Sequence, residues 1–381
     1  MFWNNPKLFP VKKQEPLNWG PWWRMMVFVI IAILIAATIS WYISQDLRFA
    51  FYAAVCIGVV FAIFILFAGW LFFRYGVEAE QGELVRARNN EMENQFENWA
   101  SQSINIIDAS FVFPPSVPIS MGCPFDVNGY VPLLLPNTDG YLRLFEDLLA
   151  PLRVNLLARG IAQPLRVYFP QDTKDFIWQQ FLHVWKSIGL SAQHLSCFFE
   201  LKNSFAEQVD EWLSEENHDD VLVIVWQFND ANDVGNYTEG AIAWLLSSNN
   251  NEVSKNKIFR PMLTNLSNVD EDIPKFLRYQ KPAKDIGTIW YNDADGPIKD
   301  KLLIAYSQAQ DNRNKNDVSP DTLLMPEQNF VTHWLGKAVN SVDWFSITLA
   351  MKNAEFQKKP QIIVLTKDNS ALLSTITPTI S

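Results

Sequence analysis

Cysteine and histidine are the side chains of this sequence from which nucleophilic or metal chemistry could be built. The sequence holds 3 cysteines and 4 histidines, which are Cys56, Cys123, Cys197, His183, His194, His218 and His333. A cysteine thiolate beside an imidazole attacks carbonyl carbons, and closely spaced Cys and His ligands hold zinc. The histidines lack the spacing of a zinc motif, so we predict no metal site. Cys56 lies in an apolar run, which leaves open a disulfide between Cys123 and Cys197.

For two of these residues we favour a structural role over a catalytic one. Cys123 stands in a Gly-Cys-Pro triplet within a proline-rich stretch, and such a stretch forms turns instead of the helix N-terminus that would activate a thiol. His183 lies on an apolar-rich segment, where a lone histidine is more often a satisfied core or surface group than a base. We assign neither residue a catalytic role.

A group of carboxylates follows the apolar segment DVLVIVWQ at 220–227. Asp230, Asp233 and Glu239 could act there as acid, base or cation ligand, because α/β proteins place ligands at strand ends. However, Asn229, Asn232, Gly235 and Asn236 lie among them, and Asn, Asp and Gly are the residues that turns require. We therefore favour a turn.

Sequence motifs for nucleotide and esterase chemistry are absent. The chain contains no GxxxxGK[ST], no GxGxxG and no GxSxG. We predict no cofactor, no catalytic residue and a protein that is not an enzyme.

Composition limits the class of partner. The 381 residues carry a formal net charge of −10, and no basic stripe is visible. Nucleic-acid binding needs clustered Lys and Arg, so a nucleic-acid partner is excluded. The apolar excess is concentrated before position 74, and the rest of the chain has the composition of a globular domain.

Two uncharged apolar runs predict a membrane anchor. The runs at 25–43 and 50–73 are each long enough to cross a bilayer as a helix, and the connector at 44–49 is short. They predict a hairpin that places both chain ends in one compartment. We expect an N-terminal tail at 1–24, a two-helix anchor at 25–75, a stalk helix at 76–103 and a soluble domain at 104–381.

Lys and Arg near the spans predict the orientation. Lys7, Lys12, Lys13 and Arg24 precede the hairpin, Arg74, Arg86 and Arg88 follow it, and only Arg48 lies between the runs. Positive residues favour the cytoplasm, so we expect an inner-membrane protein with a cytoplasmic domain.

The soluble part alternates predicted helices and strands, which is typical of a layered α/β domain with a mixed sheet. Prolines at 114–136 predict an irregular entry loop. We expect helices at 141–160, 174–188, 204–215 and 331–354, strands at 165–169, 220–227, 237–248, 286–291, 301–306 and 361–366, an extended segment at 192–199, and exposed loops at 249–257 and 308–319.

Two stretches resemble the thiolase and ketosynthase fold. One runs from Cys197 through the helix at 204–215 to DDVLVIVWQ and YTEGAIAWLLSS, and the other is THWLGKAVNSVDWFSITLAMKNA at 332–354. The resemblance implies a nucleophile position at Cys197, a histidine position at His333, and a glutamate–glycine–alanine strand that begins at Glu239 and Gly240.

The chain departs from that family in its chemistry. Bulky Phe198 and Phe199 follow Cys197, Trp334 follows His333, and the second histidine of the family's Cys-His-His set is missing. A thiolase-like domain on an N-terminal anchor is similar to the type VI lipase adapter family. That resemblance implies an adapter that contacts an effector or a subunit of the membrane complex in type VI secretion, and it implies a periplasmic domain, against the charge distribution.

Three functions follow from these observations. The first is a non-catalytic adapter or assembly protein of the cell envelope, whose partners are a secretion-system protein and the lipid bilayer. The alternative is a membrane-tethered acyl-transfer enzyme of thiolase type that uses Cys197 and His333. A third is a structural component that packs through Gly58, Ala62 and Gly69 of the hairpin. The sequence leaves the oligomeric state open.

Overall fold

The computed structural model describes most of the chain. The described residues are 3–4, 6–11, 16–46, 48–113, 140–158, 165–171, 173–195, 197–202, 204–215, 219–228, 239–247, 253–292, 298–314, 325–332, 342–367 and 369–379. Cys123, Asp230, Asp233, His218 and His333 lie outside these ranges, as does the predicted entry loop beyond Phe113.

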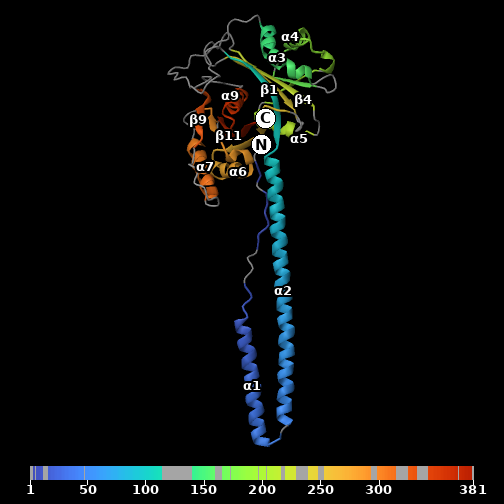
Figure 1. The fold of residues 1–381 in the computed structure, drawn as a ribbon, viewed down its shortest axis with the longest axis vertical. Helices are drawn as coiled ribbons and strands as arrows, with labels where there is room; N and C mark the ends of the chain where they lie inside the picture. Colours follow the sequence, from blue (N-terminus) through green and yellow to red (C-terminus); the bar gives the residue numbers. More distant parts are fainter. Residues whose placement is uncertain are drawn as a thin grey trace. The chain divides into compact units, whose positions relative to one another are not determined.

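Two long helices begin the structure (Figure 1). They are α1 (Gly20–Ser44) and α2 (Arg48–Ala100), and both are long and apolar enough to span a membrane. α2 contains the second predicted span and, without a break, the predicted stalk at 76–103 except for its last three residues, of which Ser103 begins a strand. No proline interrupts residues 48–100. Its 53 residues far exceed the roughly 20 residues that a bilayer requires.

Chain contacts divide the protein into two compact units. One unit is Asn5–Gln95, which holds the hairpin, and the other combines Met1–Asn4 with Phe96–Ser381. The predicted tail at 1–24 is therefore shared between the units, and α1 begins five residues before the predicted span. We call the second unit the α/β unit.

The α/β unit consists of two successive repeats with the same order of elements, apart from an extra strand in the second repeat and the places of two short 3-10 turns. The first repeat contains β1 (Ser103–Val112), α3 (Tyr141–Ala158), β2 (Leu165–Phe169), α4 (Asp175–Ser187), η1 (Ala192–His194), β3 (Phe198–Glu200), α5 (Phe205–Ser214), β4 (Asp220–Gln227) and β5 (Gly240–Ser247). The second contains β6 (Asn256–Phe259), β7 (Met262–Asn265), α6 (Val269–Tyr279), η2 (Lys281–Lys284), β8 (Thr288–Tyr291), α7 (Ile298–Asn314), β9 (Glu327–Phe330), α9 (Val342–Gln357), β10 (Gln361–Lys367) and β11 (Ser370–Pro378).

Strand pairing shows that the two repeats are equivalent. The sheet order is β3-β2-β4-β5-β1-β6-β11-β10-β8-β9, with β7 paired to β11, so each half has the same order read outward from the centre. In each half the two parallel pairings lie at the outer edge, as β2 pairs with β3 and β4, and β8 pairs with β9 and β10. The halves join where β1 pairs antiparallel with β6 over Ser103–Ile106. The predicted mixed sheet is confirmed.

Three apolar clusters form the layers of the α/β unit (Figure 1). The central cluster joins α5 and α9 to the inner faces of both half-sheets. A second cluster packs α3 and α4 on the outer face of the first half, and a third packs α6 and α7 on the outer face of the second. The two repeats thus enclose α5 and α9, which we call the core helices.

Several predicted elements are wrong in detail. The segment at 301–306 is helical within α7 and not a strand, because Leu302 and Tyr306, four residues apart, face the core together. The loop predicted at 308–319 begins inside the same helix. Within the helix predicted at 331–354, Val331 and Thr332 are helical and Val342–Gln357 is α9, while residues 333–341 lie outside the described ranges. Strand β9, which precedes them, was not predicted. The predicted strand at 237–248 is β5, and the segment at 192–199 is a short 3-10 turn followed by β3.

Candidate functional site at the core-helix junction

The first turns of the two core helices meet at the centre of the α/β unit. α5 follows β3 and α9 follows β9, so the two helices occupy equivalent places in the two repeats. The rings of Phe205 and Trp344 lie edge to face with centroids 5.0 Å apart, and both side chains belong to first turns. We call this place, formed by Ser204, Phe205, Asp343 and Trp344, the core-helix junction.

Local sequence explains why the core helices are held here. In α5 the buried side chains Phe205, Val209 and Trp212 recur at helical spacing and give the helix one apolar face. In α9 almost every residue from Trp344 to Met351 is buried, as expected for a helix enclosed by two sheets. Trp244 of β5 fixes the relative position of the layers, because its ring lies 5.1 Å from that of Trp344 and its Nε1 donates to Thr348 Oγ1 at 3.0 Å.

Asp343 is the titratable group of this junction. Burial raises the pKa of the Asp343 carboxyl from 3.8 to about 6, against the opposing effect of Lys367. The side chain lies in the first turn of α9, near the carboxyl end of β10 that carries Lys367. A carboxyl group with a pKa near neutrality can both take and give a proton at physiological pH, which is what general acid–base catalysis needs.

The strand ends beside Asp343 are rigid. Asn292, just after β8, donates from Nδ2 to the carbonyl oxygen of Thr366 at 2.7 Å, and its Oδ1 accepts from Thr366 N at 3.0 Å. Thr366 Oγ1 donates to the same oxygen at 2.9 Å. These bonds fix the carboxyl ends of parallel strands β8 and β10, which is where α/β folds place ligands.

The cysteine and histidine positions considered in the sequence analysis do not come together at the core-helix junction in the part of the chain that the structure describes. Cys197 is exposed at the amino end of β3, whereas α5 begins beyond the opposite end of that strand. The N-terminus of α5 therefore does not act on the Cys197 thiol. His333 lies outside the described residues, and its pairing with Cys197 stays a prediction. His183 is exposed on α4.

The glutamate–glycine pair predicted from the resemblance begins β5. Glu239 is half-buried next to Gly240, the first residue of that strand. A Cβ added at Gly240 would lie 2.6 Å from the Phe113 ring, so this position requires glycine for close approach and not for a turn.

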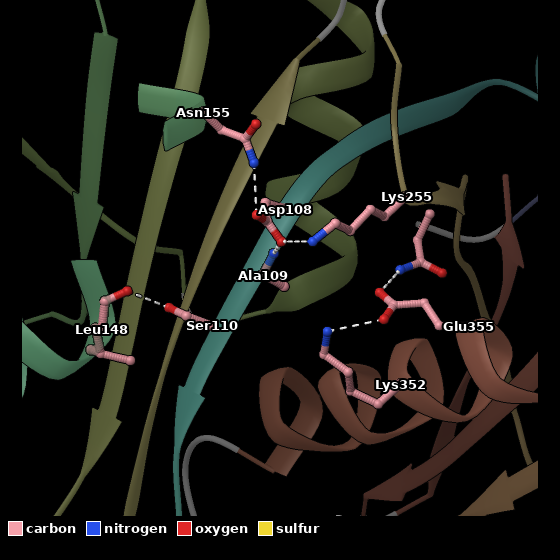
Figure 2. A network of polar contacts seen from close by, with 9 residues as sticks. Asp108, Ala109, Ser110, Leu148, Asn155, Lys255, Lys352 and Glu355 are labelled. Atoms are coloured by element: carbon pink, nitrogen blue, oxygen red, sulfur yellow. Dashed lines mark hydrogen bonds and ion pairs between the residues drawn. The ribbon is translucent and has the colours of Figure 1, made fainter. Parts of the chain in front are cut away.

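A second polar group, which sequence analysis missed, lies where the two half-sheets separate (Figure 2). Asp108 stands beside an irregularity in the pairing of β1 with β5, and its carboxylate accepts from Lys255 Nζ, from Asn155 Nδ2 at 2.7 Å and from the backbone N of Ala109 at 2.9 Å. Asp108 and Lys255 are 147 residues apart, so no local pattern links them. The signal available in the sequence was the acidic residue Asp108 inside the otherwise uncharged segment SINIIDASFV at 103–112.

The neighbouring strand β6 extends this group toward α9. Asn256, fully buried, donates from Nδ2 to Glu355 Oε1 at 2.7 Å, and Lys352 Nζ lies 3.0 Å from Glu355 Oε2. Both carboxylates thus have cationic partners, so the group is a structural network that ties α3, β1, β6 and α9 together. Across the part of the chain that the structure describes, no three His, Cys, Asp or Glu side chains gather as metal ligands.

Comparison with known proteins gives structural neighbours but no family. No family model matches the chain, and no curated protein matches it. The chain is similar to 3-oxoacyl-[acyl-carrier-protein] synthase III from Aquifex aeolicus, with a TM-score of 0.41 and 11% identity, covering 72% of this chain and 99% of that one. The corresponding synthase from Pseudomonas aeruginosa gives 0.39 and 11%, over 74% and 100%. A variant of OleA from Xanthomonas campestris gives 0.38 and 12%, over 73% and 99%.

These findings confirm one prediction and correct another. The α/β unit has the predicted thiolase-like fold with a mixed sheet. The prediction that the chain is not an enzyme is contradicted, because the structures it resembles are synthases and a condensing enzyme. The predicted membership of the type VI lipase adapter family is not supported by any of these comparisons. Likeness at this identity describes the fold and transfers no residue, substrate or partner.

Proposed function

We propose that this chain is a membrane-tethered acyl-transfer enzyme of the thiolase type, which acts on acyl thioesters. The observation that carries the proposal is the meeting of the first turns of α5 and α9, where the Phe205 and Trp344 rings lie 5.0 Å apart. Asp343 belongs to the same first turn of α9, and burial raises the pKa of its carboxyl to about 6. The position lies at the centre of the α/β unit, beside the carboxyl ends of parallel strands. This combination of a near-neutral acid with helix dipoles suits proton transfer and stabilisation of a developing oxyanion.

The chemistry of the proposed step is a thioester exchange. A thiolate attacks the carbonyl carbon of the substrate thioester, a new thioester bond forms on the enzyme, and the carbon–sulfur bond to the carrier breaks. The departing thiolate takes up the proton that the attacking thiol released, so no oxidant or reductant is required. Cys197 is the candidate nucleophile, since its exposed side chain is accessible to a substrate. Asp343 is the candidate proton carrier of the core-helix junction, which lies beyond the other end of β3, so the proposal requires the substrate to reach both places.

Covalent trapping tests this function. Full-length protein in detergent is incubated with acetyl-CoA or palmitoyl-CoA, and the acylated residue is located by peptide mass spectrometry. We expect an acyl adduct that Cys197→Ser abolishes and that Asp343→Asn slows. Cys56→Ser is the matched control, because Cys56 is also exposed but lies in the apolar part of α2.

Each outcome decides a separate point. An adduct on Cys197 supports both the function and the nucleophile. An adduct elsewhere in the α/β unit keeps acyl transfer and rejects Cys197. Acylation confined to Cys56, or no acylation with either substrate, overturns the proposal.

An envelope partner is a second proposal, drawn from the sequence resemblance. Val154 and Leu157, one helical turn apart on α3, are 75% and 47% exposed, and such outward-facing apolar side chains suit a protein interface. The partner proposed is an effector or membrane-complex subunit of a type VI secretion system. Co-purification with such a subunit that is lost in a Val154→Glu, Leu157→Glu double variant supports the proposal, and unchanged co-purification rejects this surface.

A further inference from the structure

The third residue of the chain is part of the core of the α/β unit. Trp3 is only 5% exposed, although chain ends are ordinarily frayed. Its ring lies edge to face with Phe96 at 6.1 Å and Trp99 at 5.8 Å, and 5.9 Å from Phe276. Its Nε1 donates to the carbonyl oxygen of Pro261 at 3.1 Å. The indole therefore has both an apolar site for its ring and an acceptor for its only donor.

The site that receives Trp3 is built and rigid. We call it the Trp3 socket, formed by Phe96, Trp99, Pro261 and Phe276. Phe96 packs on Trp99 at 5.3 Å and on Tyr279 at 4.8 Å. The Arg260 guanidinium lies 4.5 Å above the Trp99 ring and so orients it. The socket thus combines the last turn of α2, helix α6 and the turn between β6 and β7.

A second contact holds the N-terminal segment along α2. Asn89 donates from Nδ2 to the carbonyl oxygen of Phe9 at 2.9 Å, and its Oδ1 accepts from Phe9 N at 2.9 Å. One amide side chain therefore satisfies both backbone groups of one residue, as a neighbouring strand would. The side chains of Leu8 and Phe9 are 45% and 53% exposed, so the backbone and not the side chain makes this contact.

We infer that the N-terminal segment is an intramolecular clamp whose anchor is Trp3 in the Trp3 socket. The chain leaves the α/β unit after Asn4 and returns to it at Phe96, with the whole hairpin between. Seating Trp3 therefore closes the hairpin into a loop fastened at both ends to one folded body. A tryptophan cannot occupy that core from across a bilayer, so the N-terminus and the α/β unit occupy the same compartment.

Limited proteolysis of the full-length protein in nanodiscs tests the clamp. Trypsin cleaves after Lys7, which lies between the two contacts and is exposed. We expect Trp3→Ala to raise the rate of this cleavage at least tenfold, because release of Trp3 frees the segment to enter the protease. Phe9→Ala is the matched control, since it removes an exposed aromatic ring from the same segment and leaves the backbone bonds to Asn89 intact; its rate should equal that of the unmodified protein.

Loss of folding must be distinguished from release of the clamp. The large tryptic fragment of the α/β unit should remain resistant in Trp3→Ala, and Trp3→Phe should restore part of the protection. Equal cleavage rates after Lys7 in the unmodified protein and Trp3→Ala overturn the proposal. If the body of Trp3→Ala is itself degraded, the conservative Trp3→Phe variant decides. Cleavage after Lys7 at the rate of the unmodified protein in an intact Trp3→Phe variant also rejects the clamp.

Discussion

Removing Asp210 should strongly destabilise the α/β unit, because it leaves the buried cation Arg260 without its carboxylate. The Arg260 side chain is 3% exposed and forms an ion pair with Asp210 of α5. Its Nε also donates to the Trp99 carbonyl oxygen at 3.2 Å, and a further nitrogen donates to Gln102 Oε1. Burial lowers the pKa of Arg260 to about 10 in the unmodified protein. Because arginine does not lose its proton in proteins, the guanidinium stays charged at pH 7 in the Asp210→Ala variant.

The size of the effect follows from that geometry. Removing one partner of a buried ion pair costs about 3–5 kcal/mol, because the remaining charge is buried without compensation. For a domain of this size, we expect the melting temperature to fall by about 10 °C. Replacing both partners, as in Asp210→Ala with Arg260→Met, should recover part of the loss, since no buried charge then remains.

Thermal unfolding of the full-length protein, followed by circular dichroism in detergent, measures this difference. Asp270→Ala is the control, because Asp270 pairs with Lys301 at 2.9 Å but is 70% exposed, and such surface pairs contribute less than about 1 kcal/mol. If Asp210→Ala and Asp270→Ala lower the melting temperature equally, Arg260 is not a buried cation held by Asp210 and the reasoning is refuted.

Three further predictions use other parts of the α/β unit. Since burial raises the pKa of Asp343 from 3.8 to about 6, its stabilising contribution is complete below pH 3.8 and is lost as the pH rises through 6. Asp343→Asn should therefore make the free energy of unfolding depend less on pH between pH 4 and 7. At pH 7 it should raise the free energy of unfolding by about 1–2 kcal/mol, a value lowered because the Asp343 side chain is partly exposed. Urea unfolding measures this, and an unchanged pH profile would exclude the pKa shift. Gln361→Leu should lower the free energy of unfolding in urea by about 2–4 kcal/mol, because it leaves two buried donors without their acceptor. Gln361 Oε1 accepts from Trp290 Nε1 at 3.1 Å and from Asn353 Nδ2 at 3.0 Å. The control Gln193→Leu, at an exposed residue, should leave the free energy of unfolding unchanged. Gly240→Ala should lower the melting temperature and cost about 1–3 kcal/mol of stability, because the added Cβ would lie 2.6 Å from the Phe113 ring. In the control Gly82→Ala the added Cβ meets nothing within 4 Å, so this change should stabilise α2. An unchanged melting temperature in Gly240→Ala would contradict the close approach.

The side of the membrane on which the α/β unit lies stays a prediction. The distribution of Lys and Arg favours the cytoplasm, and the adapter resemblance implies the periplasm. A membrane-impermeant thiol reagent can decide this with a cysteine at Val253, which is 85% exposed on the α/β unit.

The sequence by itself determined the features that depend on local pattern. Uncharged runs longer than a bilayer requires define α1 and the first part of α2, and no tertiary contact is needed to recognise them. Strands buried on both faces, such as β4 and β10, show as continuous apolar runs, and α5 shows as an amphipathic helix. These patterns were sufficient for the class of a layered α/β domain preceded by two helices that are long and apolar enough to span a membrane.

Tertiary structure alone decided the features that depend on distant residues. The segment at 301–306 has five apolar or aromatic residues that suit a strand or a helix equally, and packing of α7 against α6 selected the helix. The bond between Asp108 and Lys255 joins residues far apart in the chain, and the pKa of Asp343 depends on the layers that bury it. The burial of Trp3 likewise depends on Phe96 and Phe276, which only folding brings to the N-terminus. Side-chain periodicity records the local backbone and its buried face, whereas charge, burial and pairing at a site arise from neighbours that no local window of sequence contains.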